Sequence, residues 1–330
     1  MPSFRTGAVT EIISERPGLQ RIVVGTDAAY VLTELVGDVE VGDFVIVNTT
    51  AVELGLGTGG AHVVHWNLSR NAWTSDRPGH VMKMRYSSSQ TDVNATGSDL
   101  SSLDGMPVVV CDLHSQVPAV AVAFKAATDA RLAYVMTDGG ALPLALSDLV
   151  YELRSRNLID VTITAGHAFG GDVEAVSIYD GLALAREHAE AVVVAMGPGS
   201  VGTGTTLGFS GIDTGNALNA ADALGGLPIA ALRASDRDPR ERHRGISHHS
   251  VTGLTLATQA RVTVAAPEGL DLDAEIEARH EIVRLPALGI ATRMERAGLT
   301  VTSMGRPAAD DPVLFECAAA AGTIAAQRLP

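Results

Sequence analysis

The sequence contains little cysteine and little lysine. Its 330 residues include two cysteines, Cys111 and Cys317, and two lysines, Lys83 and Lys125. Two cysteines are too few for a disulfide framework or a four-cysteine zinc site, as is typical of a reducing compartment. The 38 acidic residues outnumber the 24 basic ones, which gives a net charge of −14. Because an acidic protein repels a phosphate backbone, we do not expect nucleic acid as a partner.

The sequence also lacks the patterns of secretion and of membrane insertion. Residues 1–13 have no basic start followed by an apolar core, so they do not resemble a signal peptide. An uncharged run of 22 residues, 191–212, contains six glycines and Pro198. Such a run is unsuited to a helix in lipid. We therefore expect a cytoplasmic protein with no membrane partner.

A core of ordinary size is expected, because 46% of the residues are hydrophobic. Residues 1–66 show short β-type runs that alternate with turn signals such as Pro17-Gly18 and Gly42-Asp43. These spacings predict a small antiparallel β-barrel. Residues 67–105 are polar and read as a linker or excursion, with one plausible strand at 81–86. Residues 106–330 form the larger predicted domain, which would bind the ligand.

The larger domain is predicted to be α/β, because continuous apolar runs alternate with helical patterns. The link 166–172 is too short for a parallel crossover, so the strands on either side of it are expected to pair antiparallel. The prediction is a mixed, mostly parallel sheet that helices cover on both faces. The expected strands are 108–111, 132–136, 161–164, 173–178, 191–196, 227–232 and 262–265, and the expected helices are 117–127, 144–156, 182–189, 216–224 and 272–283.

Polar residues follow several of these strands at the edge where α/β proteins bind ligands. Asp112 and His114 follow the first strand, and their spacing predicts that they lie on one side of an extended chain. His167 follows the third, and the segment RERHRGISHHS after the sixth strand holds His243, His248 and His249. If these ends converge, Asp112, His114, His167, His248 and His249 form a ligand set suited to zinc or another divalent metal. Asp112, His114, His167 and His248 are then also the candidate catalytic groups.

An ordinary interpretation competes with this site. No HExxH or paired CxxC motif is present, and loops after strands are polar in any protein of this class. Adjacent His248 and His249 would point about 100° apart on a helix, so we expect at most one of them to face a given site. Scattered surface or capping histidines are the alternative.

A glycine-rich segment, MGPGSVGTGTTLGFSG, follows the fifth apolar run at residues 196–211. Its peptide N–H groups and hydroxyls can hold an anion, such as a phosphate or nucleotide. The glycines satisfy G-x-G-x-x-G, but the helix is delayed to about Asp213, and no acid stands where a dinucleotide site needs one. A purely structural turn is the alternative. The residues predicted to bind a cofactor or anion are Gly197, Gly199, Ser200, Gly202, Thr203, Gly204 and Thr205.

Two further motifs match known enzyme patterns in poor context. Pro198 stands where a nucleophile elbow around Ser200 needs glycine, which disfavours a serine hydrolase. Residues 53–59, ELGLGTG, fit the glycine loop of S-adenosylmethionine-dependent methyltransferases. The alternating segment AHVVHW follows them instead of a helix, so a turn in the barrel is the simpler interpretation.

Long strings of the sequence resemble an uncharacterised bacterial family, a domain of unknown function found in actinobacteria and firmicutes. The resemblance covers nearly the whole chain and implies no activity. It places the ELGLGTG segment in that family's own pattern, which weakens the methyltransferase reading. The strings are VNTTAVELGLGTGG, HVVHWNL, CDLHSQ, MGPGSVGTGTTLGFSG, RGISHHS and SMGRPAADDP.

The leading functional hypothesis is an enzyme that binds a small anionic ligand, such as a nucleotide or phosphorylated metabolite, at the strand ends. A divalent metal is the cofactor that the polar residues suit, and metal-assisted hydrolysis or transfer is the expected chemistry. A non-catalytic, ligand-sensing regulatory protein is the alternative, with methyl transfer after it. The apolar tail 317–326 would be either core or the interface of a homo-oligomer.

Overall fold

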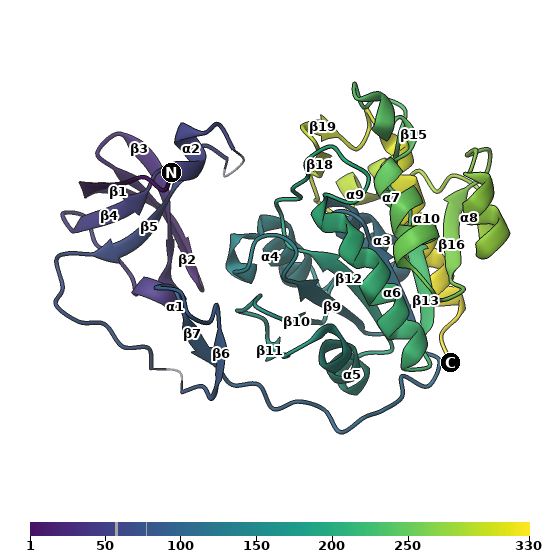
Figure 1. The fold of residues 1–330 in the computed structure, drawn as a ribbon, viewed down its shortest axis with the longest axis horizontal. Helices are drawn as coiled ribbons and strands as arrows, with labels where there is room; N and C mark the ends of the chain where they lie inside the picture. Colours follow the sequence, from purple (N-terminus) through teal and green to yellow (C-terminus); the bar gives the residue numbers. More distant parts are fainter. Residues whose placement is uncertain (57–58, 77) are drawn as a thin grey trace. The chain divides into compact units, whose positions relative to one another are not determined.

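The structure is a computed structural model that describes residues 1–56, 59–76 and 78–330 (Figure 1). The chain divides into two compact units, Met1–Asn94 and Ala95–Pro330. The division between the units falls within the predicted linker 67–105. Among the residues that the structure describes, no helix combines the length and apolar character that crossing a membrane requires.

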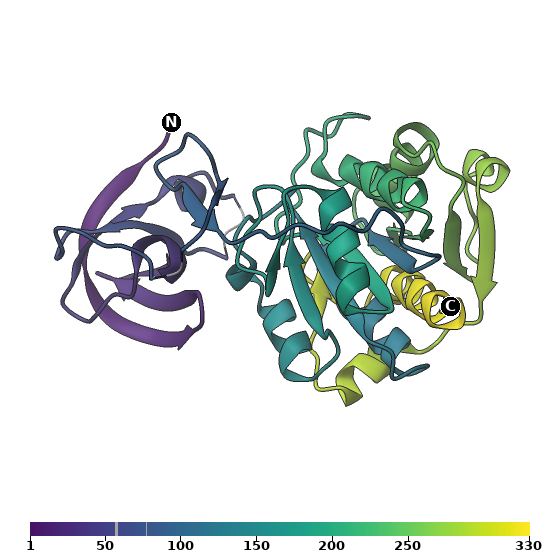
Figure 2. The ribbon, with the colours of Figure 1, turned by 90° about the horizontal axis from the view of Figure 1, so that it is seen from below.

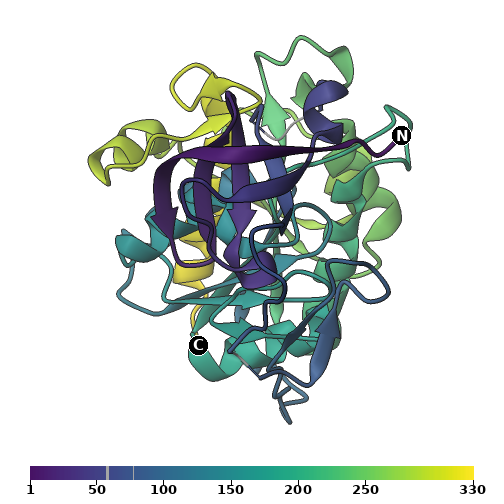
Figure 3. The same ribbon diagram turned by 90° about the vertical axis from the view of Figure 1, so that its left-hand side faces the viewer.

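The first unit contains a closed five-stranded barrel in the order β1-β2-β3-β5-β4, which confirms the predicted small barrel (Figure 3). Its neighbouring strands pair antiparallel except β3 and β5, which pair parallel. Gly18 and Gly42 take positive φ values of 81° and 99°, which suit glycine in the turns predicted there. The elements are β1 (Phe4–Arg16), β2 (Leu19–Val24), β3 (Asp27–Leu32), α1 (Thr33–Val36), β4 (Phe44–Asn48), α2 (Thr50–Glu53) and β5 (His62–Asn67).

The polar stretch after the barrel contains a short hairpin. β6 (Val81–Lys83) lies within the strand expected there, and it pairs antiparallel with β7 (Thr91–Val93). Residues 57 and 58 of the methyltransferase-like ELGLGTG segment lie outside the described residues. The segment connects β4 to β5, which pair antiparallel, so it does not open the βαβ unit that a methyltransferase loop requires.

The second unit, whose strands are labelled in Figure 1 where there is room, is built on an eight-stranded sheet in the order β11-β10-β9-β12-β8-β13-β16-β17. Seven of its strands overlap the predicted apolar runs, although β11 covers only two residues of the predicted strand 173–178. β17 was missed, because it lies in a segment whose charges gave a helical pattern; there the helix α8 ends at Arg279 and an edge strand follows. The strands are β8 (Pro107–Cys111), β9 (Leu132–Thr137), β10 (Val161–Thr164), β11 (Val173–Glu174), β12 (Ala191–Met196), β13 (Leu227–Ala231), β16 (Thr263–Pro267) and β17 (Glu281–Leu285).

The sheet is parallel throughout, so the predicted antiparallel pair is wrong. Ile163 of β10 pairs with Val173 of β11, and the two strands run in the same direction. Strand β11 has only two residues, and the loop before it folds back along β10 without a helix. The Asp172 carboxylate accepts hydrogen bonds from the N–H and hydroxyl of Thr162, at 2.8 and 2.9 Å, and holds this return in place.

Helices cover both faces of the sheet, as predicted (Figure 2). Successive residues of a strand point to opposite faces, so Val109 packs in the core with α10, and Val110 packs in the core with α6. The alanine-rich tail is core, because residues 317–321 of α10 are fully buried. The first face carries α3 (Val117–Lys125), α4 (Asp148–Ser155), α9 (Ile290–Arg296) and α10 (Pro312–Gln327); the second carries α5 (Ile178–His188), α6 (Thr214–Ala223) and α8 (Ala274–Arg279).

Short elements beyond the carboxyl ends of the strands complete the unit. The helix α7 (His248–Thr252) continues into a π-helical turn at Gly253–Ala257. The remaining strands form two small hairpins, β14 (Ala234–Ser235) with β15 (Gly245–Ile246) and β18 (Thr302–Ser303) with β19 (Arg306–Pro307).

Candidate functional site

The carboxyl ends of the parallel strands bring the predicted site residues to one edge of the sheet. The chain leaves β8 and β9 toward the face that carries α3 and α4, and it leaves β12 and β13 toward the face that carries α6. β12 lies between β9 and β8 in the sheet. The connection that leaves β12 therefore goes to one face, and the connections that leave its two neighbours go to the other. Such switch points are where open α/β sheets bind ligands.

A cavity of about 210 Å³ lies at this switch point. His114 lines it together with Gly197, Gly199 and Ser200, so the structure brings together these four predicted residues. None of the described residues that line the cavity carries an acidic side chain, a lysine or an arginine. An anion held there would depend on peptide N–H groups and hydroxyls. The other lining residues are Leu113, Ser115, Leu149, Met196, Pro198, Thr302, Ser303 and Met304.

His114 is buried, and both of its ring nitrogens have hydroxyl partners. Its Nδ1 lies 3.1 Å from the Tyr134 hydroxyl, and its Nε2 lies 2.7 Å from the Ser147 hydroxyl. Burial lowers the pKa of His114 to about 4, so the imidazole is neutral at physiological pH. With both nitrogens engaged, His114 shapes the cavity and is not available as a metal ligand in this conformation.

The tip of the glycine-rich segment satisfies its own polar groups. The Thr203 N–H donates to the Gly208 carbonyl at 2.7 Å, and the hydroxyls of Thr203 and Thr205 lie 2.9 Å apart. Gly202 forms a β-bridge with Phe209. The predicted anion-binding residues therefore divide into two groups: Gly197, Gly199 and Ser200 line the cavity, whereas Gly202, Thr203, Gly204 and Thr205 form an exposed hairpin. The helix α6 begins after Asp213, as predicted.

Asp112 does not lie beside His114, so the prediction that both face one side is wrong. Asp112 is buried toward α6 and α7, where it accepts a hydrogen bond from the Ser250 hydroxyl. His114 begins a 3-10 turn and contacts Tyr134 on the other face. The strand ends at Cys111, so the two-residue alternation does not continue to His114. Burial raises the pKa of Asp112, and the Ser250 hydrogen bond and the Arg233 charge oppose that effect.

His167 lies farther along the same edge, after β10. Its backbone N–H donates to Asp138 at 2.9 Å. Asp138 and Gly166 line a second cavity, of about 220 Å³, with Asp213, and His167 lines neither this cavity nor the one that contains His114. Burial raises the pKa of Asp213, and so does the neighbouring Asp138 carboxylate. His167 therefore shares no cavity with His114 among those described at this edge.

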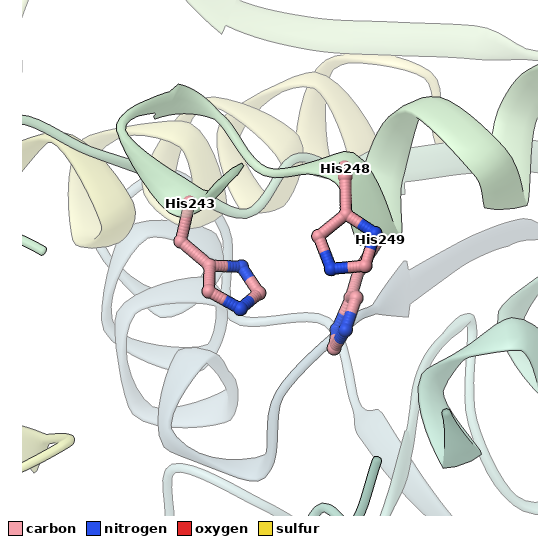
Figure 4. A group of neighbouring side chains, drawn as sticks. All are labelled: His243, His248 and His249. Carbon is pink, nitrogen blue, oxygen red and sulfur yellow. The ribbon is translucent and has the colours of Figure 1, made fainter. Parts of the chain in front are cut away.

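The histidines of the RERHRGISHHS segment form a compact cluster (Figure 4). One candidate ligand atom from each of His243, His248 and His249 lies within 4.8 Å of the other two. The rings of His248 and His249 have centroids 4.4 Å apart, so the expectation that at most one of them faces a site is wrong. They are the first two residues of α7, and the centroids of their rings lie 5.0 and 4.9 Å from that of His243 in the preceding 3-10 turn.

These three imidazoles are held in the neutral form that binds metals. Burial and the nearby Arg233 charge lower the pKa of His243 to about 4 and that of His249 to about 3. Burial and Arg242 lower the pKa of His248. His243 Nδ1 lies 2.7 Å from the Ser247 hydroxyl, which leaves Nε2 for a ligand. Among the described residues, the buried Nε2 of His248 has no hydrogen-bond partner.

Two residues that the sequence analysis did not assign to the site hold His249 in place. The Phe209 ring stacks on the His249 ring with centroids 3.9 Å apart and an angle of 5° between the rings. Phe209 belongs to the glycine-rich segment, so that segment and the histidine cluster are in contact. On the other side, the buried Arg233 donates from Nη1 to His249 Nδ1 at 2.9 Å.

Residues 28–322 match a family described as a protein of unknown function (DUF3866). The chain belongs to the DUF3866 family. The matched region contains the glycine-rich segment, the histidine cluster and Arg233. Neither the curated proteins nor the solved structures include a match to the chain.

Sequence reasoning located the segment of this DUF3866 protein that forms the cluster, but it assigned only two of its three histidines to a site. Three histidines within seven residues, 243–249, were the signal that could have added His243. Arg233 had a weaker signal, its position directly after a buried strand. Phe209 had none, because its contact with His249 depends on the path of the glycine-rich segment.

Proposed function

We propose that the protein is an enzyme that binds a small anionic ligand at the carboxyl edge of its sheet and acts on it with a divalent metal. The metal ligands would be His243, His248 and His249. The observation that carries this proposal is the cluster itself, in which three neutral imidazoles offer ligand atoms within 4.8 Å of one another.

The donor set fits a catalytic zinc or a similar ion. Zinc–nitrogen bonds of 2.0–2.1 Å place the nitrogens of a tetrahedral site about 3.3 Å apart, so the cluster would close by about 1.5 Å at its widest. Three protein ligands leave a fourth position for water or substrate. A metal there would lower the pKa of bound water and polarise a phosphoryl or carbonyl oxygen, which supports hydrolysis or group transfer.

The surroundings of the three histidine rings also support a metal site. The Ser247 hydroxyl bonds to His243 Nδ1 and so orients the ring with Nε2 free, as partners of metal-bound histidines do. The unpartnered Nε2 of His248 is a further argument, because a buried polar atom without a partner is costly unless a ligand supplies one.

The anionic ligand has two sources of binding energy at this edge. Arg233 supplies a buried guanidinium beside the cluster, and a guanidinium pairs well with phosphate or carboxylate oxygens. Gly197, Gly199 and Ser200 supply peptide groups at the cavity that His114 lines. The contact between Phe209 and His249 joins the segments that carry these groups.

Metal analysis of purified protein tests the metal site. After loading with zinc and removal of excess metal, we expect one bound ion per chain, and His248→Ala should reduce the bound metal at least about tenfold, because the site loses a ligand. His80→Ala is the matched control, since His80 is exposed and lies in the first unit. Equal metal content in His248→Ala and wild type would refute the proposed site.

Activity assays test the chemistry separately. The zinc-loaded protein should hydrolyse or transfer a group from a compound in a panel of phosphate esters and nucleotides, and His248→Ala should lose that activity. Ligands that raise the melting temperature without any product would favour the ligand-sensing alternative. That outcome would reject the enzyme and retain the binding site.

A further inference from the structure

Arg233 engages the one electron pair that a neutral His249 ring could offer to a metal. A neutral imidazole has one nitrogen that accepts and one that donates, and a guanidinium can only donate. The 2.9 Å contact between Arg233 Nη1 and His249 Nδ1 therefore identifies Nδ1 as the acceptor. The single free electron pair of the His249 ring points at Arg233. For His249 to bind a metal, this hydrogen bond must break.

The backbone of Arg233 is fixed, so the change must come from its side chain. Its N–H donates to the Ser250 hydroxyl at 2.9 Å, and its carbonyl accepts from the Ser247 N–H at 2.8 Å. The side chain is buried, with the residue only 5% exposed. A buried guanidinium that leaves His249 needs another acceptor, because an unpaired buried charge is strongly unfavourable.

The neighbouring carboxylates already have partners. Asp238 accepts from Nε and Nη2 of Arg240 at 2.9 and 2.8 Å, and Arg306 lies 3.4 Å from it. Asp112 accepts from Ser250. An oxyanion from outside would offer Arg233 two parallel charge-assisted hydrogen bonds, which are stronger than one hydrogen bond to a neutral ring.

We propose that Arg233 couples ligand and metal: an oxyanion, phosphate-like or carboxylate, draws its guanidinium away from His249 and frees that ring to bind the metal. This inference rests on the proposed function. It adds that binding of the oxyanion prepares the cluster to bind the metal. Metal and oxyanion should bind cooperatively, each strengthening the other by the same factor. Without an oxyanion, Arg233 weakens the binding of metal by the cluster.

Titration with Co²⁺, followed by its visible absorption, tests this in the full chain. Sulfate is the phosphate-like probe, acetate is the carboxylate probe, and chloride at equal ionic strength is the reference. We expect Co²⁺ to bind wild type at least about fivefold more tightly in sulfate or acetate than in chloride, which is the lower end of usual coupling. The stronger of the two anions identifies the preferred oxyanion.

Arg233→Met should bind Co²⁺ more tightly than wild type in chloride and should show no dependence on sulfate, because the competing donor is gone. Arg244→Met, which changes an exposed arginine of the RERHRGISHHS segment, should behave like wild type. If Arg233→Met does not fold, the anion dependence of wild type still decides the question.

Two results would contradict parts of this account. Equal Co²⁺ affinity of wild type in sulfate, acetate and chloride overturns the coupling. This holds even if Arg233→Met binds Co²⁺ more tightly, since a group other than the oxyanion would then accept the hydrogen bonds of Arg233. Tight binding that His248→Ala abolishes retains the metal site in that case. No Co²⁺ binding by wild type or Arg233→Met in any buffer would overturn the proposed function itself.

Discussion

His114 lies buried between the hydroxyls of Tyr134 and Ser147, and its burial determines its charge. Its place after a strand predicts a metal ligand or catalytic group. In the structure, His114 lines the cavity at the switch point. Whether its ring nitrogens can bind a metal depends on two hydroxyls from distant parts of the chain. No local sequence pattern reveals these contacts.

The pH dependence of stability tests the state of His114. Its pKa is about 4 in the folded protein and about 6.5 when exposed, so the unfolded chain binds more protons between these values. The contribution of His114 to the free energy of unfolding is therefore fully present above about pH 6.5. It falls as the pH drops toward 4, by up to about 3 kcal/mol. Urea unfolding measures the free energy of unfolding of wild type and His114→Gln between about pH 4 and pH 7, the range that these pKa values set. We expect it to depend less on pH in the variant. Parallel curves for the two proteins would contradict this account of His114.

At the scale of elements, the tight packing of α10 on α3 explains the alanine-rich tail. Gly322 faces the carbonyl oxygen of Val120 so closely that a Cβ atom at this position would overlap it. Alanines at 318–321 allow the same close approach along the helix. The composition of the tail could be read from the sequence, but its partner could not, because residues 120 and 322 meet only in the folded chain.

Gly322→Ala should destabilise the protein, although alanine favours helices. The added methyl group must displace the backbone of α3, and overpacking of this kind costs roughly 1–3 kcal/mol, more than the helix propensity returns. Gln327→Ala, at an exposed position of the same helix, is the control. The midpoint of urea unfolding measures both. A Gly322→Ala protein as stable as wild type would show that the helices separate without cost.

At the scale of the whole molecule, the candidate site belongs to one unit. The histidine cluster, Arg233, the cavity of His114 and every hydrogen-bond partner named for them lie within Ala95–Pro330. This unit has its own core on both faces of the sheet. The barrel has a separate core around Ile22 and Val45.

A fragment of residues 95–330 should therefore fold and bind the same metal as the full chain. Cooperative urea unfolding and metal content after zinc loading measure these two properties, and the full chain is the reference. A fragment that folds but binds no metal would show that the barrel is needed to complete the site.

The sequence by itself determined the barrel, the alternation of strands and helices and the edge at which polar residues collect, because these depend on periodicities and turn signals within short segments. Only the tertiary structure decided that β11 runs parallel to β10 and that Asp112 and His114 face apart. It also decided that Arg233 and Phe209 hold His249. Such contacts depend on the paths of loops between distant segments. These paths are set by packing and hydrogen bonds that no single segment contains.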